Sequence, residues 1–160
     1  MNETDELSRR LGEACKAKGA VIATAESCTG GGVGEAITRT PGSSAWFDRG
    51  FVTYTDAAKV DLLEVRQETL GSHGAVSEAV AREMATGALH QSDATIAVAV
   101  TGIAGPGGGS VAKPVGLVWF AWASLEGERV SRFEVFGGDR AAIREQAVRE
   151  ALRGLEAMLG

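Results

Sequence analysis

One run of residues limits the possible folds more than any other feature of the sequence. Residues 94–100 (ATIAVAV) are uncharged, largely β-branched or small, and are followed directly by a glycine-rich loop. A short apolar run of this kind is typical of a strand that is covered on both faces. A second such run, residues 20–24 (AVIAT), lies near the N-terminus. Helical patterns precede, separate and follow these runs, so the sequence predicts helices packed on both faces of a sheet.

The remaining elements follow from periodicity and turn signals. Apolar residues at helical spacing, with capping residues and glycine stops, predict helices over 4–18, 32–39, 56–64, 77–90 and 140–158. Further strands are predicted over 45–54, 115–124 and 129–136, and Glu126-Gly127 forms the turn between the last two. We therefore expect one α/β domain over residues 1–160. It is predicted to be a three-layer α/β/α sandwich with a mixed, mostly parallel sheet and a C-terminal β-hairpin.

Composition argues against several classes of protein. The net charge is −5 and no basic stripe is present, so nonspecific nucleic-acid binding is not expected. No run reaches the roughly 18 apolar residues of a membrane span, and the N-terminus lacks the features of a signal peptide. Two cysteines, Cys15 and Cys28, fit reduced thiols better than a disulfide framework or metal site. We expect a cytoplasmic protein without nucleic-acid or membrane partners, and without a metal.

Ser27 stands between a buried strand and a helix, where α/β folds usually bind ligands. Two interpretations are open: Ser27 or Thr29 caps the helix, or Ser27 is a nucleophile beside helix-start N–H groups that hold an anion. The G-x-S-x-G pattern of many hydrolases and the P-loop pattern are both absent. A serine nucleophile needs a base, and Lys59 is a candidate because a buried lysine can replace histidine. Tyr54 precedes it in a Y-x-x-x-x-K pattern.

Two further places suggest ligand binding. Thr101 and Gly102 end the buried strand, and the glycines that follow allow a ligand to approach the backbone. Arg140 lies in the first turn of the last helix after the expected cap, Asp139, where a cation opposes the helix dipole. That placement favours a site in which the arginine and the helix start jointly hold an anion such as a phosphate. Arg144, one turn further on, is the alternative phosphate ligand.

The motifs together resemble a known family. Residues 24–31 (TAESCTGG), 41–44 (PGSS), 54–59, 74–78 (GAVSE), 101–106 (TGIAGP) and 137–140 (GGDR) resemble, in order, the CinA C-terminal domain family, the PncC nicotinamide-nucleotide amidases. The resemblance spans essentially the whole chain, although residues 107–114 depart from the family's usual glycine loop.

The resemblance implies hydrolysis of nicotinamide mononucleotide to nicotinate mononucleotide and ammonia, without a cofactor. It implies Ser27 as nucleophile, Lys59 as general base and Tyr54 as a support for proton transfer. The substrate-binding residues that it implies are Thr29, Gly30, Ser44, Thr101, Gly102 and Arg140.

Other functions stay open at this point. One is a non-catalytic nucleotide-binding module linked to competence or DNA damage, and another is a Ser-Lys amidase or esterase for a different small substrate. We also expect a homo-oligomer, a dimer or larger, since Trp46, Trp119 and Trp122 fit an interface as well as a core.

Overall fold

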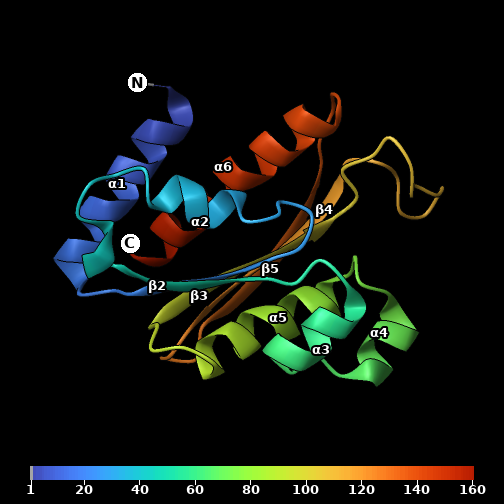
Figure 1. Cartoon of the computed structure of the whole chain (residues 1–160), viewed down its shortest axis with the longest axis horizontal. Helices are drawn as coiled ribbons and strands as arrows, with labels where there is room; N and C mark the ends of the chain where they lie inside the picture. The colour runs from blue at the N-terminus through green and yellow to red at the C-terminus, as the bar shows by residue number, and fades with distance from the viewer. Residues whose placement is uncertain (1) are drawn as a thin grey trace.

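The computed structural model describes residues 2–160 (Figure 1). Its elements follow one another as α1 (Glu3–Lys18), β1 (Ile22–Glu26), α2 (Gly32–Ile37), the 3-10 turn η1 (Ser43–Ala45), β2 (Phe47–Val52), α3 (Asp56–Leu63), α4 (Gln67–His73), α5 (Glu78–His90), β3 (Ile96–Gly102), β4 (Leu117–Ser124), β5 (Arg129–Val135) and α6 (Arg140–Met158).

The sheet has the strand order β2-β1-β3-β4-β5. β1 pairs in parallel with β2 and with β3, whereas β4 pairs antiparallel with β3 and with β5. Of the five strands in residues 2–160, β4 is thus the one that runs against the others. Helices α1, α2 and α6 cover one face, and α3, α4 and α5 lie on the other (Figure 1). The predicted three-layer α/β fold with a mixed, mostly parallel sheet is confirmed.

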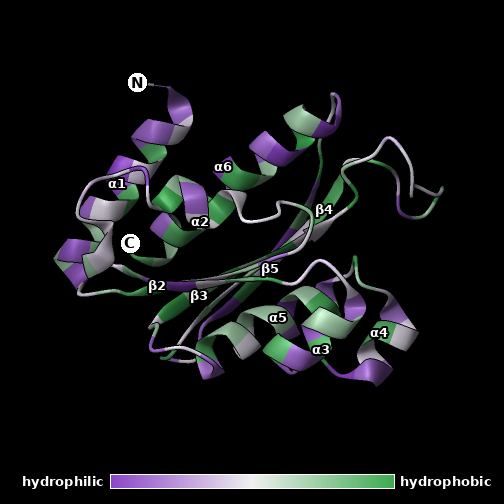
Figure 2. Cartoon of the chain, viewed as in Figure 1, coloured by the Kyte–Doolittle hydropathy of each residue, from purple (hydrophilic) through white to green (hydrophobic). Residues whose placement is uncertain are grey.

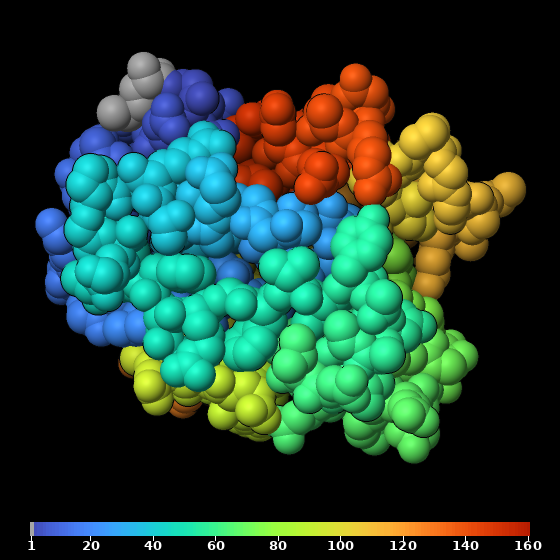
Figure 3. Space-filling model, in the orientation of Figure 1, coloured from blue at the N-terminus to red at the C-terminus, as the bar shows by residue number. Residues whose placement is uncertain are grey.

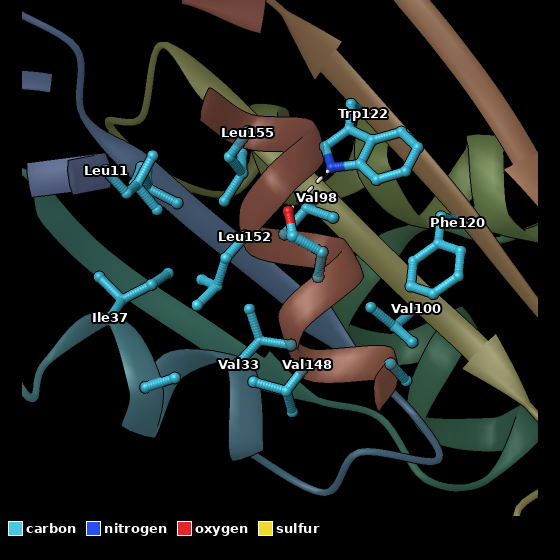
Figure 4. Close-up of a cluster of buried hydrophobic side chains, with 14 of the residues drawn as sticks. Leu11, Val33, Ile37, Val98, Val100, Phe120, Trp122, Val148, Leu152 and Leu155 are labelled. Carbon is cyan, nitrogen blue, oxygen red and sulfur yellow. Dashed lines mark hydrogen bonds between the residues drawn. The ribbon is translucent and has the colours of Figure 1, made fainter. Parts of the chain in front are cut away.

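Each face of the sheet has its own core. Figure 2 shows the apolar sides of the helices turned toward the strands. Beneath α6, Trp122 and Phe120 of β4 pack with leucines and valines of α6, α1 and α2 (Figure 4). The Trp122 ring donates a hydrogen bond from Nε1 to the Ala151 carbonyl at 3.1 Å. The core beneath α5 is built from small side chains, mainly alanines of β1, β3 and β4, which let that helix pack closely against the sheet.

Most helix starts have the expected capping chemistry. Asp139 caps α6 through a bond from the Ala142 N–H, and Ser77 caps α5. α1 begins one residue earlier than predicted, because Asn2 rather than Thr4 caps it in a capping box with Asp5. Helix α4 was not predicted: it has seven residues and no side-chain cap, so its sequence gives only a weak signal.

The parallel strands set the position of the candidate site. The carboxyl ends of β1, β2 and β3 lie at one edge of the sheet, so the segments that begin at Ser27, Thr53 and Ile103 meet there. The loop between β3 and β4 projects at the right of the molecule in Figure 3, and Val111 in this loop is fully exposed. None of the helices in residues 2–160 has the length and apolar character needed to cross a membrane.

Candidate active site

Ser27 lies at the floor of a pocket of about 220 Å³. Its N–H donates to the Val100 carbonyl of β3 at 2.9 Å, which fixes the turn after β1 against the neighbouring strand. The residue is 8% exposed. The pocket is lined by Ser27, Cys28, Tyr54, Asp56, Lys59, Ala75, Val76, Thr101, Gly102, Ala104 and Arg140. Five segments that are far apart in the sequence therefore meet around one hydroxyl.

Lys59 makes direct contact with this hydroxyl. The first turn of α3, capped by Thr55, carries Lys59 under the turn of Ser27. Its Nζ donates to Ser27 Oγ at 3.0 Å and to the Thr53 carbonyl at 2.8 Å, and the residue is 1% exposed. Burial lowers the pKa of Lys59 from its ordinary value, and the nearby Asp56 carboxylate opposes that change. A lysine in this setting loses its proton more readily than a surface lysine and can then accept one from the serine.

The thiol next to Ser27 is poorly suited to act as a nucleophile. Cys28 also lines the pocket, but burial raises the pKa of its thiol to about 12. The reactive form of cysteine is the thiolate, so this side chain stays protonated and unreactive near neutral pH. Cys15 and Cys28 are both buried and free.

Glu26, not Ser27 or Thr29, satisfies the start of α2. Its buried carboxylate accepts hydrogen bonds from the N–H groups of Gly31, Val33 and Gly34 and from the Thr29 hydroxyl. Two expectations are corrected by this arrangement. Neither Ser27 nor Thr29 caps the helix, and the N–H groups of α2 are not open to an external anion, because a carboxylate of the same chain already occupies them.

The backbone N–H groups of residues 28–30 lie next to Ser27. The Gly30 N–H donates to the Ser27 carbonyl at 3.1 Å. Neither the Cys28 N–H nor the Thr29 N–H donates to another residue within residues 2–160, and the Cys28 N–H bonds only to its own thiol. These two donors next to Ser27 are therefore candidates to donate to a ligand.

Arg140 stands at the mouth of the pocket, at the first position of α6. Its guanidinium donates to the Gly105 carbonyl at 2.7 Å and to the Tyr54 hydroxyl at 3.0 Å. Both partners are neutral, so the positive charge at this helix start is not compensated by them. Tyr54 is 58% exposed and its hydroxyl contacts Arg140 rather than Ser27 or Lys59. The tyrosine therefore holds the arginine in place, and among the described residues it makes no hydrogen bond to Ser27 or Lys59.

The other expected binding residues divide into two groups. Thr101 and Gly102 line the pocket; the Thr101 hydroxyl donates to the Ala75 carbonyl at 2.9 Å. Gly102 lacks a side chain for a packing reason, because a Cβ there would lie 2.7 Å from Val118. Ser44 precedes β2 and so lies at the opposite end of that strand from the pocket. Because a strand of this length spans roughly 17–20 Å, Ser44 is not part of the pocket.

Thr29 and Gly30 also lie outside the lining of the pocket. The Thr29 side chain is used by Glu26, and Gly30 has φ +57°, a left-handed conformation that suits glycine. Only the beginning of the glycine-rich loop, up to Gly105, reaches the site.

Sequence reasoning missed several contributors. Asp56 had a signal, since it lies three residues before Lys59 on the same short helix. Ala75 and Val76 have no reactive or charged side chain that would mark them in the sequence, and they line the pocket only because the fold places them there. Within residues 2–160, no group of three His, Cys, Asp or Glu side chains is placed to hold a metal ion. Neither histidine lines the pocket.

The whole chain is similar to known proteins. A sequence profile of the CinA C-terminal domain matches residues 4–159. This chain belongs to the CinA C-terminal domain family.

Relatives within the CinA family match almost end to end. The nicotinamide-nucleotide amidohydrolase PncC of Escherichia coli K12 is 56% identical over 154 residues, which cover 96% of this chain and 93% of that protein. The protein of the same name from Pseudomonas putida is 53% identical over 156 residues, covering 97% and 96%. Among solved structures, the competence/damage inducible protein CihA from Agrobacterium tumefaciens superposes with a TM-score of 0.98 at 49% identity, covering 100% of this chain and 98% of that one.

Proposed function

We propose that this chain is a nicotinamide-nucleotide amidase that converts nicotinamide mononucleotide to nicotinate mononucleotide and ammonia. The observation that carries the proposal is the 3.0 Å contact between the buried Lys59 amine and the Ser27 hydroxyl, at the floor of a pocket with a cation at its mouth. Two relatives that share more than half of the sequence bear the name of this activity. The names of these relatives suggest the substrate, and the pocket has side chains suited to hydrolysing its carboxamide.

The reaction begins with neutral Lys59. Its amine accepts the proton of Ser27 while Oγ adds to the carboxamide carbon, and the Cys28 and Thr29 N–H groups stabilise the oxyanion. The Lys59 ammonium then gives its proton to the nitrogen, the C–N bond breaks, and ammonia leaves an ester on Ser27. A water molecule next loses a proton to Lys59 and attacks the ester. Collapse of the second intermediate returns the proton to Ser27 and releases the carboxylic acid. Every proton in these steps is exchanged among Ser27, Lys59, water and the substrate, and no atom changes oxidation state, so the proposed reaction requires no cofactor.

The substrate fits the pocket in one direction. A pocket of about 220 Å³ is small for a whole nucleotide, so the aromatic ring and its carboxamide occupy it while the ribose and phosphate extend to the mouth. There the uncompensated Arg140 guanidinium binds the phosphate. Thr101 and Gly102 contact the ring, and Tyr54 contributes by orienting Arg140. Apart from the backbone N–H of Thr29, we assign no substrate contact to Thr29, Gly30 or Ser44, which lie outside the lining.

An ammonia-release assay on nicotinamide mononucleotide tests the proposal. Wild type is expected to release ammonia and nicotinate mononucleotide in equal amounts. Ser27→Ala and Lys59→Met are each expected to lower kcat by about 10⁴-fold or more, since groups that act as a unit fail together. Cys28→Ser serves as a matched control, because it changes the adjacent side chain and leaves the Ser-Lys pair; it should keep kcat within about tenfold. Binding of the nucleotide without ammonia release by the wild type would show a non-catalytic module instead.

A further inference from the structure

Arg144 lies one helical turn after Arg140, yet its guanidinium faces a different part of the molecule. Nε donates to the Cys28 carbonyl at 3.1 Å and Nη2 lies 3.3 Å from the Thr29 carbonyl. The side chain borders a second cavity of about 230 Å³, which shares no lining residue with the pocket of Ser27. Of the two arginines considered as phosphate ligands, Arg144 is thus already committed to the backbone of the turn that follows Ser27.

Those two carbonyls determine where the adjacent N–H groups point. A peptide unit is planar and almost always trans, so its C=O and N–H point in opposite directions. The Cys28 carbonyl shares its unit with the Thr29 N–H, which donates to no other residue within residues 2–160. The Thr29 carbonyl shares its unit with the Gly30 N–H, which donates to the Ser27 carbonyl. Holding both carbonyls on the α6 side therefore turns the Thr29 N–H away from α6.

The fit around this guanidinium is close. A Cβ at position 30 would lie 3.2 Å from Nη2, so the left-handed glycine leaves room for the fork of the arginine. A cation that donates to the carbonyl oxygen of a peptide unit also polarises the N–H of that unit, because hydrogen bonds in a chain strengthen one another. The arginine thus acts on the direction and the strength of the same donor.

We infer that Arg144 is a positioning residue for the oxyanion donors of Ser27 and does not bind the phosphate. The inference rests on the proposed amidase function. Arg144 acts through the turn 28–30 and touches no substrate atom. It stabilises the tetrahedral intermediate and leaves binding of the intact carboxamide unchanged, because the negative charge on oxygen develops only during the reaction.

A comparison of kcat with KM tests this role. Arg144→Lys keeps the charge but loses the planar fork that serves two carbonyls at once. It is expected to lower kcat for nicotinamide mononucleotide by about 10²-fold, the typical effect of a misplacement of about 1 Å, with KM within about threefold of wild type. In a Ser27→Ala background, the affinity for the nucleotide should stay the same. Arg140→Gln should do the opposite, raising KM and weakening binding in that background.

A matched control comes from the same helix. Arg153→Lys changes an exposed arginine of α6 that pairs with Glu3, and it should leave kcat and KM unchanged. Thermal unfolding of each variant checks the fold, and Arg144→Gln provides a second variant at the site.

Three results would overturn the inference. Weaker nucleotide binding with kcat retained would make Arg144 a phosphate ligand. Unchanged kcat and KM would mean that the turn does not need it, and loss of folding in both Arg144 variants would make it a structural residue. Failure of the amidase proposal looks different, because the wild type itself would then release no ammonia.

Discussion

Glu26→Gln is expected to destabilise the protein strongly although it changes few atoms. One carboxylate oxygen accepts from Thr29, Gly31 and Val33, and the other accepts from the Gly34 N–H at 3.0 Å. An amide keeps one acceptor oxygen and places a donor NH₂ where the other oxygen was. In Glu26→Gln, at least one backbone N–H then faces the NH₂ of the new amide instead of a carboxylate oxygen. Losing that hydrogen bond to a charged group lowers the free energy of unfolding by about 1.5–3 kcal/mol.

Loss of the negative charge adds to this cost. The charge lies buried at the positive end of α2, where it is worth about 0.3–2 kcal/mol. The total is roughly 2–5 kcal/mol, which lowers the midpoint of urea unfolding by about 1–2 M for a typical slope. Activity should fall as well, because the same carboxylate anchors the turn after Ser27.

Urea unfolding followed by tryptophan fluorescence measures this effect. Glu35→Gln is the matched control: it makes the same change within α2, the helix that Glu26 caps from β1, but the Glu35 side chain is 60% exposed and pairs with Arg39 at the surface. Such pairs contribute little, so its free energy of unfolding should change by less than about 0.5 kcal/mol. If the two variants unfolded at the same urea concentration, the carboxylate of Glu26 would not stabilise the start of α2 as described.

Three further predictions follow from single contacts. Asp56→Asn removes the carboxylate that opposes the lowered pKa of Lys59, so the acidic limb of the kcat–pH profile should move to lower pH, and a shift to higher pH would contradict this sign. Tyr54→Phe removes the hydroxyl that holds Arg140 at 3.0 Å; steady-state kinetics should show KM raised several-fold with kcat nearly intact, whereas a 10³-fold loss of kcat would assign Tyr54 to proton transfer. Gly154→Ala would place a Cβ 2.0 Å from the buried Trp122 ring, so thermal unfolding should show destabilisation by about 3 kcal/mol, and a stability equal to wild type would refute the packing described for α6.

The sequence predicted the architecture well because its signals are local. The apolar run at 94–100 and the capped helix from Arg140 depend on periodicity and on capping residues, and both lie within two residues of the expected bounds. Helix α4 gave too weak a local signal, and the position of Ser44 depends on which end of β2 it occupies, which follows from strand pairing rather than spacing.

The site was predicted less completely because its contacts join residues that are far apart in the sequence. Ser27 and Lys59 were named from motifs, but their contact depends on α3 passing under the β1 turn, a long-range arrangement. The role of Glu26 was missed because a glutamate before a serine has many possible partners, and only the fold shows that it accepts from the start of α2. Arg144 was an alternative phosphate ligand in the sequence, and its two carbonyl partners became visible only in three dimensions.

The most direct test of Ser27 as a nucleophile activated by Lys59 is mass spectrometry of acid-quenched enzyme. Wild type is mixed rapidly with nicotinamide mononucleotide, quenched within one turnover, and digested to locate any adduct. The account predicts a nicotinate mononucleotide ester on the peptide that carries Ser27, and no adduct in Ser27→Ala or Lys59→Met. Wild-type enzyme that stays unmodified through a full turnover, together with undiminished ammonia release by Ser27→Ala, would contradict it.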